Sequence, residues 1–205
     1  MKLAKQLLGK GLIGEVVGVQ AEEGSSSDWP RSPAYFDPAL SGGGALMDVG
    51  IHSIDLIRWF AGEFDQLEYR GNGSSTAVAS DAQLDFSVAN GAQGRVVASR
   101  TRNLAQKLTL TGTAGFLEVG LWHPGLSIRC AKGKAFQNHY RLDTAVPRRP
   151  PLDSSFVDQL RNLVAAIRHE QDVLVNGHEG MAEVDVVRRA YTGQAAEPLL
   201  RNTKP

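Results

Sequence analysis

The chain has 205 residues, of which 42% are hydrophobic and 21% charged, a composition typical of soluble globular proteins with a substantial core. Lysine plus arginine equals aspartate plus glutamate at 22 each, so no net field attracts nucleic acid or anionic lipid, and we expect neither partner. The single cysteine, Cys130, excludes an internal disulfide and favours a reducing, cytoplasmic location. No apolar run approaches the roughly 20 residues that span a bilayer.

The first part of the chain, residues 1–62, predicts two helices and one strand. Met1–Leu8 has the leucine spacing of a short amphipathic helix, and the valine-rich run Glu15–Glu22 predicts a strand. Gly24–Gly44 is rich in glycine, serine and proline and predicts a long loop. Ala45–Ala61 predicts a helix capped by Gly62, because apolar residues recur there at helical spacing: Leu46, Ile51, Ile54, Ile57 and Phe60.

Residues 64–142 predict successive strands of one sheet. Val78–Val88 alternates apolar and polar residues, which places one face on a core and the other toward water or a partner. Short glycine-containing turns between the strands favour antiparallel hairpins. The other expected strands are Leu67–Asn72, Gln93–Thr101, Lys107–Thr111, Phe116–Leu121, Leu126–Cys130 and Ala135–Arg141.

The last part of the chain, residues 153–193, predicts two closing helices after the proline-rich linker Pro147–Pro151. Asp153 or Ser154 can cap the first, whose apolar face comprises Phe156, Leu160, Leu163, Val164 and Ile167. The second covers about Glu179–Tyr191. We therefore expect one α+β domain over residues 1–205, with a mostly antiparallel, open-faced sheet and its helices packed on one face.

A glycine pattern at Gly9–Gly14 matches the G-x-G-x-x-G fingerprint of dinucleotide binding. That fingerprint requires a strand before the glycines and a helix after them, so that the pyrophosphate lies at a helix N-terminus. Here the expected helix precedes the glycines and the expected strand follows. We interpret the motif as a helix-to-strand turn and expect no cofactor to bind this chain alone.

The most informative residues are Asp48, His52 and Asp55, whose spacing places them on one face of the expected helix. A carboxylate beside an imidazole makes the ring a stronger base, which suits proton transfer at a substrate hydroxyl. A purely structural alternative stays open, since Asp48 in a first turn also complements the helix dipole, and His52 can be a histidine of a half-buried helix. Two such ligands without a third do not predict a metal site.

The run from Gly42 to Gly62, with the pattern GGGxLxDxGxHxxDLxxWxxG, resembles the signature of the glucose-fructose oxidoreductase / inositol dehydrogenase (Gfo/Idh/MocA) family. Leu7–Val17 is similar to the family's entry into its C-terminal domain. Leu110–Glu118 is similar to its G-T-x-G hairpin, and Gly177–Thr192 to its closing helix. The resemblance implies the C-terminal, substrate-binding and oligomerisation domain of an oxidoreductase.

By this resemblance His52 is the catalytic proton acceptor or donor and Asp48 orients it, while hydride passes between a sugar or polyol and NAD(P). In the family a lysine from a Glu-Lys-Pro motif completes the group. That lysine and the N-terminal Rossmann domain are both absent from this sequence. The chain is therefore expected to be truncated relative to the family, inactive alone, and dependent on a Rossmann domain, either in cis or as a separate partner.

Candidate contacts to the small-molecule substrate come from three further regions. The loop containing Trp29, Arg31 and Tyr35 resembles a substrate-lining segment of the family, and an exposed tryptophan can stack on a sugar. Asp55 shares the face of His52. Arg100 lies with Arg102 on one face of a strand and can meet a polar substrate, although a solvated or interface position is the alternative for both.

Other functions stay open beside the oxidoreductase: a non-redox sugar-binding or dimerisation module, and a cofactor-independent lyase or isomerase that uses Asp48 and His52 for proton abstraction. A sheet covered on one side leaves its other face open, and large exposed apolar patches are rare on monomers. In the family this face commonly packs against a second subunit. We therefore expect a homodimer through the open sheet face, within residues 64–141.

Overall fold

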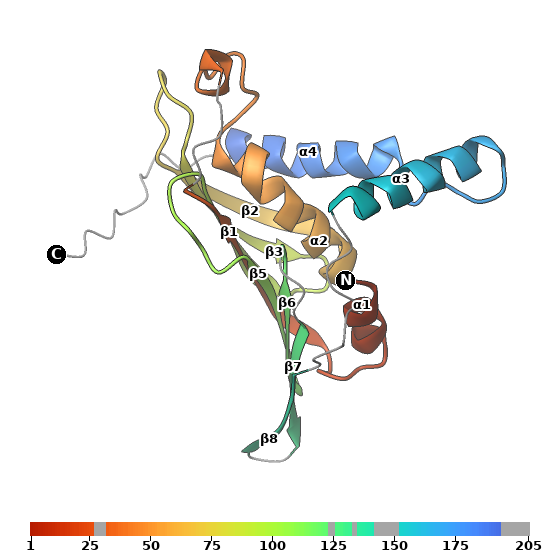
Figure 1. Cartoon of the computed structure of the whole chain (residues 1–205). Helices are drawn as coiled ribbons and strands as arrows, with labels where there is room; N and C mark the ends of the chain where they lie inside the picture. The colour runs from red at the N-terminus through yellow and green to blue at the C-terminus, as the bar shows by residue number, and fades with distance from the viewer. Residues whose placement is uncertain (27–31, 123–125, 133–134, 142–151, 194–205) are drawn as a thin grey trace.

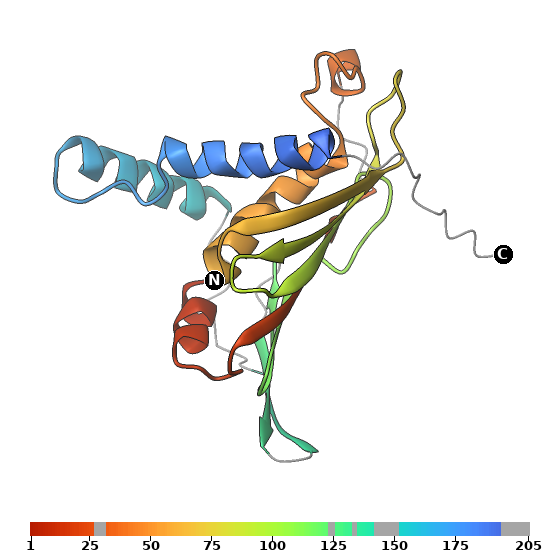
Figure 2. The same cartoon turned by 180° about the vertical axis from the view of Figure 1, so that it is seen from behind.

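The computed structural model describes residues 1–26, 32–122, 126–132, 135–141 and 152–193. One eight-stranded sheet carries the helices α1, α2 and α4 on the same side, and the opposite face is bare (Figure 1; Figure 2). The arrangement confirms the expected α+β fold with helices on one face of a mostly antiparallel sheet.

The strand order is β2-β3-β4-β1-β5-β6-β7-β8. Neighbours pair antiparallel except β1 and β4, which run parallel. The first strand of the chain therefore lies inside the sheet, between the two sets of hairpins. The strands are β1 (Val16–Gly24), β2 (Phe64–Gly71), β3 (Asp81–Val88), β4 (Gln93–Ser99), β5 (Lys107–Gly112), β6 (Gly115–Gly120), β7 (Leu126–Lys132) and β8 (Ala135–Arg141).

The helices are α1 (Lys2–Gly9), α2 (Ile51–Ala61), α3 (Leu152–Ile167) and α4 (Gly177–Thr192). A 3₁₀ turn, η1 (Pro33–Tyr35), and a π-helical turn, η2 (Leu46–Gly50), precede α2. The expected uninterrupted helix over Ala45–Ala61 is therefore wrong in its first turn. Asn176 caps α4, since its side chain accepts hydrogen bonds from the backbone N–H groups of His178 and Glu179.

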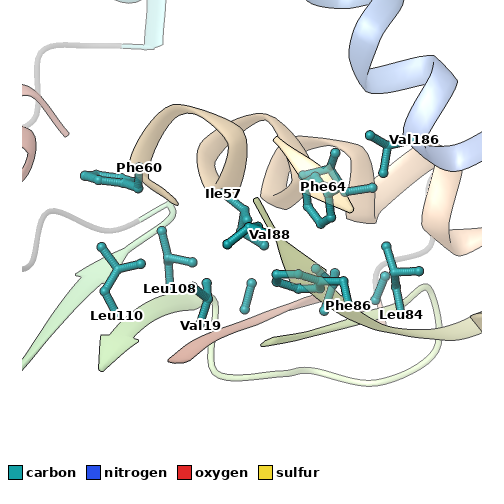
Figure 3. Packing of buried hydrophobic residues seen from close by; sticks show 14 of the residues in the cluster. Val19, Ile57, Phe60, Phe64, Leu84, Phe86, Val88, Leu108, Leu110 and Val186 are labelled. Atoms are coloured by element: carbon teal, nitrogen blue, oxygen red, sulfur yellow. The ribbon is translucent and has the colours of Figure 1, made fainter. Parts of the chain in front are cut away.

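The core lies between the sheet and the helices α2 and α4 (Figure 3). Strand β3 shows why: its alternate residues Ala82, Leu84, Phe86 and Val88 are buried, and the residues between them are partly exposed. Ile57 and Phe60 of α2 and Val186 of α4 cover the strands from above. Each such side chain stabilises the fold by about 1.5–3 kcal/mol through loss of apolar surface to water.

The helix α3 departs from the expected packing. Its apolar residues, which the sequence assigns to a core face, are 46–68% exposed: Phe156, Leu160, Leu163, Val164 and Ile167. The helix extends beyond the edge of the sheet, so the described residues do not cover this face (Figure 1). Helical spacing correctly indicates an apolar stripe, but it does not say which surface buries it.

The glycine motif forms the turn between α1 and β1. Gly11 and Gly14 have positive φ values of 70° and 73°, which glycine adopts without strain. A helix precedes the motif and a strand follows it, as expected for a turn rather than a phosphate cradle. None of the helices in the described part of the chain is long and apolar enough to cross a membrane.

Candidate functional site

The turn that carries Asp48 is fixed by close backbone packing. Gly44 approaches Ala79 so closely that an added Cβ would lie 2.3 Å from the carbonyl oxygen of Ala79. The N–H of Ala45 donates to that oxygen at 2.7 Å, and the hydroxyl of Tyr191 in α4 accepts from the N–H of Gly44 at 3.2 Å. At this position the glycine run serves backbone packing. The π-helical turn η2 follows at once, and such turns often occur at functional sites.

Asp48 is held by two side chains on one oxygen. Arg100 Nε donates to Asp48 Oδ2 at 3.0 Å, and the hydroxyl of Tyr35 in η1 donates to the same oxygen. The Arg100 guanidinium also lies over the Tyr35 ring, 3.9 Å from its centroid. Tyr35 and Arg100, two expected substrate contacts, therefore meet at Asp48. Arg100 is 6% exposed, so the alternative of a solvated face is wrong for this residue.

The Arg100 side chain has donor capacity to spare. Its Nη1 is buried and has no hydrogen-bond partner among the described residues, which is unusual for a charged group. Arg100 follows β4 directly, so the sheet fixes its position beneath η2. We conclude that Arg100 acts on Asp48 directly, and its contact with a substrate remains a prediction.

His52 lies in the first turn of α2 with an exposed side chain, so it is not enclosed in the core. Its ring contacts the indole of Trp122 edge to face, with centroids 5.9 Å apart and planes at 89°. Trp122 follows β6 and is 47% exposed. The described hydrogen bonds of Asp48 go to Tyr35 and Arg100, so orientation of His52 by Asp48 remains a prediction.

Glu23, near the end of β1, is a buried carboxylate beside this pair and is 3% exposed. Its Oε2 accepts from Ser53 Oγ and its Oε1 from Trp122 Nε1, both at 2.9 Å. Burial raises the pKa of Glu23, the hydrogen bond from Ser53 and the charge of His52 oppose the rise, and the charge of Asp48 adds to it. Glu23 thus lies within electrostatic reach of both candidate catalytic residues.

Glu23, Ser53 and Trp122 are not among the site residues predicted from the sequence. A signal for Glu23 was available, because Val19, Ala21 and Glu23 alternate along β1 on its buried face. The expected strand ended at Glu22, two residues before the observed end at Gly24, so Glu23 fell between the expected strand and the expected loop. Nothing in the sequence alone places Trp122, which is 99 residues away from Glu23, beside it.

Asp55 turns toward α4 and away from this group. Its carboxyl shares a hydrogen bond with Glu183, and Arg58 Nη1 lies 3.9 Å from Glu183 Oε1. Burial, the hydrogen bond to Asp55 and the charge of Asp55 raise the pKa of Glu183 to about 7, against the opposing charge of Arg58. A substrate contact by Asp55 remains a prediction.

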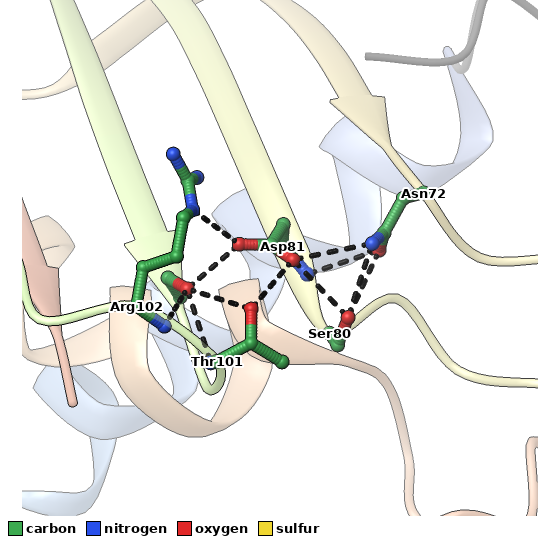
Figure 4. Close-up of polar contacts among 6 residues, drawn as sticks. Asn72, Ser80, Asp81, Thr101 and Arg102 are labelled. Carbon is green, nitrogen blue, oxygen red and sulfur yellow. Dashed lines mark hydrogen bonds and ion pairs between the residues drawn. The ribbon is translucent and has the colours of Figure 1, made fainter. Parts of the chain in front are cut away.

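Two further candidates, Trp29 and Arg31, lie outside the described residues. Arg102 is largely exposed, and its Nε donates to Asp81 Oδ1 at 2.9 Å (Figure 4). Burial disfavours ionisation of Asp81, but hydrogen bonds from Ser99, Arg102 and Thr101 hold its pKa below the ordinary value. This network ties the start of β3 to the segment after β4, and so supports the segment that carries Arg100.

The Gly9–Gly14 motif does not fit a dinucleotide, since the helix α1 precedes it and the strand β1 follows it, so no helix N-terminus faces the glycines. Within the same ranges, no cluster of three or more His, Cys, Asp or Glu side chains could hold a metal ion. The chemistry that these residues can supply is therefore proton transfer and polar binding.

A broad hollow lies on the bare face of the sheet, away from His52. It measures about 640 Å³ and crosses β1 to β5, and its polar lining includes Gln20, Glu68, Asp85, Arg95, Thr109 and Thr111. The hollow is broad and open, which suits a protein contact better than a buried small molecule.

Residues 1–118 match the model of the GFO/IDH/MocA C-terminal domain. Since the match covers more than half of the chain, the chain belongs to this family. A comparison with curated proteins finds no match.

Solved structures share the fold at low sequence identity. An NAD binding oxidoreductase from Klebsiella pneumoniae superposes with a TM-score of 0.79 at 18% identity, covering 94% of this chain and 60% of its own. A levoglucosan dehydrogenase in complex with NADH superposes with a TM-score of 0.74 at 19% identity, and the match covers 94% of this chain and 61% of the dehydrogenase. An aldose-aldose oxidoreductase from Caulobacter crescentus, complexed with glycerol, superposes with a TM-score of 0.73 at 20% identity, and the match covers 93% of this chain and 56% of the oxidoreductase. The chain thus spans only about three fifths of these proteins.

Proposed function

We propose that this chain is the substrate-binding and proton-transfer half of a nicotinamide-dependent oxidoreductase that acts on a sugar, polyol or related hydroxy compound. The observation that carries the proposal is the exposed imidazole of His52, next to the anchored carboxylate of Asp48, on the helix side of a GFO/IDH/MocA C-terminal domain. Two structural neighbours, an aldose-aldose oxidoreductase and a levoglucosan dehydrogenase, support the substrate class.

Oxidation of a secondary alcohol removes a proton from the hydroxyl and a hydride from the carbon that bears it. The imidazole of His52 accepts the proton, as the O–H bond breaks and an N–H bond forms; in reduction it donates the proton back. Asp48 contributes an anchored carboxylate one helical turn before His52, and Arg100 and Tyr35 keep that carboxylate in one orientation. Because the Gly9–Gly14 motif is a helix-to-strand turn and not a strand-to-helix turn, we assign the hydride carrier to another domain.

The surroundings of His52 favour a sugar or polyol over an apolar alcohol. Trp122 offers a half-exposed indole beside the imidazole, and aromatic faces pack on the C–H surface of sugar rings while polar groups bind their hydroxyls. Tyr35 supplies a polar hydroxyl near Asp48.

We also propose that a Rossmann domain covers α3. The chain spans 56–61% of its structural neighbours, so those chains hold a substantial further part. The apolar stripe of α3, with Phe156, Leu160 and Ile167 each more than 60% exposed, is the kind of surface that a further domain buries.

A homodimer through the bare sheet face is part of the proposal. The sheet is complete within this chain, and the hollow across β1 to β5 offers a broad face for a second copy. Its polar lining favours a contact of mixed character with trapped water.

Sugar binding by the chain is tested with saturation-transfer NMR, using D-glucose, glycerol and levoglucosan as probes. We expect transfer to at least one probe and a reduced signal in Trp122→Ala, with Trp59→Ala as the control, because Trp59 is 40% exposed elsewhere on α2. Absence of binding by all three probes would contradict the proposed substrate class. Chemical conversion of a probe with no nicotinamide present would instead favour a cofactor-independent lyase or isomerase.

A further inference from the structure

The carboxylate of Glu23 has no role in the proton transfer described above, although it lies directly beneath it. A buried carboxylate is costly unless its surroundings favour the charged form. Both of its oxygens accept hydrogen bonds, one from Ser53 and one from Trp122, and two acceptors are what the ionised form offers. Both donors are neutral, so neither cancels the negative charge.

Asp48 differs in this respect. Its Oδ2 receives the guanidinium of Arg100 as well as the hydroxyl of Tyr35. Seen from His52, a negative and a positive charge lie close together, and their fields largely cancel. Within the described ranges, the buried carboxylate of Glu23 makes no ion pair with a cation, and both of its hydrogen-bond donors are neutral.

Glu23 is also linked to His52 by contacts on both sides. Ser53, which donates to Glu23, is the residue next to His52 on α2, and Trp122, which donates to the other oxygen, contacts the imidazole edge to face. The carboxylate therefore fixes the indole that lies against the ring, and it faces the ring from inside the fold, where water screens charge weakly.

We propose that Glu23 is a positioning residue for His52: its charge stabilises the protonated imidazole, and its hydrogen bond to Trp122 holds the indole against the ring. The inference rests on the proposed role of His52 as the proton acceptor. The negative charge that stabilises the imidazolium of His52 is then mainly that of Glu23 on β1, and Asp48 is an anchored polar contact.

The groups that face His52 from the packed elements are Glu23 on β1, Asp48 on η2 and Arg100 after β4, with Asp55 on its own helix. A test must isolate Glu23 from the other three. NMR of the imidazole in the 205-residue chain does so without substrate or cofactor, so its result is independent of whether the chain binds a sugar.

In Glu23→Gln the amide keeps the shape: its oxygen can accept from Trp122 Nε1 and its NH2 group can donate to the Ser53 hydroxyl, but the charge is lost. We expect the protonated imidazole of His52 to be less stable in this variant than in the wild type, which NMR detects as a lower titration midpoint. Glu22→Gln, one residue earlier on the same strand and outside the buried face, is the matched control and should leave the midpoint nearly unchanged. Equal midpoints in the wild type and both variants would overturn the proposal.

If Glu23→Gln fails to fold, the reciprocal measurement decides. His52 is exposed, so His52→Gln should fold, and linkage requires equal coupling in the two directions. We expect the carboxyl-carbon titration of Glu23 to move up by the same amount when the imidazolium is removed. A Glu23 titration unaffected by His52→Gln would also overturn the proposal. Lack of sugar binding with intact Glu23–His52 coupling would instead reject only the proposed function.

Discussion

The guanidinium of Arg100 donates to Asp48 at 3.0 Å from a position that is almost completely buried, while Asp48 itself is 39% exposed. The buried partner is thus the cation. When the pair is broken, the buried guanidinium is left with an unpaired charge that water cannot solvate, whereas the half-exposed carboxylate can form hydrogen bonds with water.

We therefore expect Arg100→Gln and Asp48→Asn each to lower the free energy of unfolding by about 1–3 kcal/mol, the range for hydrogen bonds to charged groups. In a double-mutant cycle the two changes should couple by about 0.5–3 kcal/mol, because they remove one shared contact. Urea denaturation measures both. Arg102→Gln is the control. Arg102 also pairs with an aspartate, Asp81, but its own side chain is 55% exposed, so the free energy of unfolding should fall by less than about 1 kcal/mol. Additive effects at Arg100 and Asp48 would show that the contact is not formed in solution.

Glu183 provides a prediction about pH. Its pKa is raised from 4.5 to about 7, chiefly by burial and by its hydrogen bond to Asp55. The folded state therefore holds a proton that the unfolded chain releases near 4.5. Its contribution to stability is complete below that value and is lost as the pH rises through about 7. We expect the free energy of unfolding to fall with rising pH across this window, relative to Glu183→Gln, which cannot ionise.

The measurement is a series of urea titrations from about pH 4.5 to pH 8 on both proteins. The control is Glu179→Gln on the same helix, since Glu179 also pairs with Arg58 but is 53% exposed. This control should keep the slope of the wild type. Parallel stability curves for the wild type and Glu183→Gln would show that the carboxyl pair does not share a proton.

Local sequence patterns predict the strands and the catalytic candidates, but they do not predict the contacts made by tertiary packing. Periodicity of two placed the strands, such as β3, within a few residues, because each has one buried face. The spacing from Asp48 to His52 found the catalytic candidates, but it could not find the π turn or the partners that Arg100 and Tyr35 provide, which are set by the tertiary packing around Gly44. The pairing of Asp55 with Glu183 depends on how α4 lies on α2, and no local pattern encodes that.

The glycine turn at Gly9–Gly14 leads to a prediction about cofactor. Gly14 lies against Thr113, where an added Cβ would meet the Thr113 hydroxyl at 2.2 Å, so the turn is packed on the β5–β6 hairpin. We expect calorimetry to detect no binding of NADH or NADPH to the chain at micromolar to millimolar concentrations, since no helix N-terminus follows the glycines. A complete nicotinamide-dependent dehydrogenase is the positive control. Micromolar binding that is lost in Gly11→Val would mean that this turn does hold the pyrophosphate.

The bare face of the sheet gives the last prediction, which concerns assembly. A second copy packed on this face should bury roughly 1,000–2,000 Å² in total, the range of stable complexes. Thr109 lies on β5, in the lining of the hollow, and an arginine there places a charge in the middle of the contact. For the wild type at tens of micromolar, we expect light scattering to give twice the chain mass of 22.1 kDa. Thr109→Arg should be monomeric, and Gln6→Arg, on the exposed surface of α1, should remain dimeric. Far-ultraviolet circular dichroism confirms that each variant is folded. A wild type that is monomeric under these conditions, or a Thr109→Arg variant that is still dimeric, would reject the sheet face as the interface.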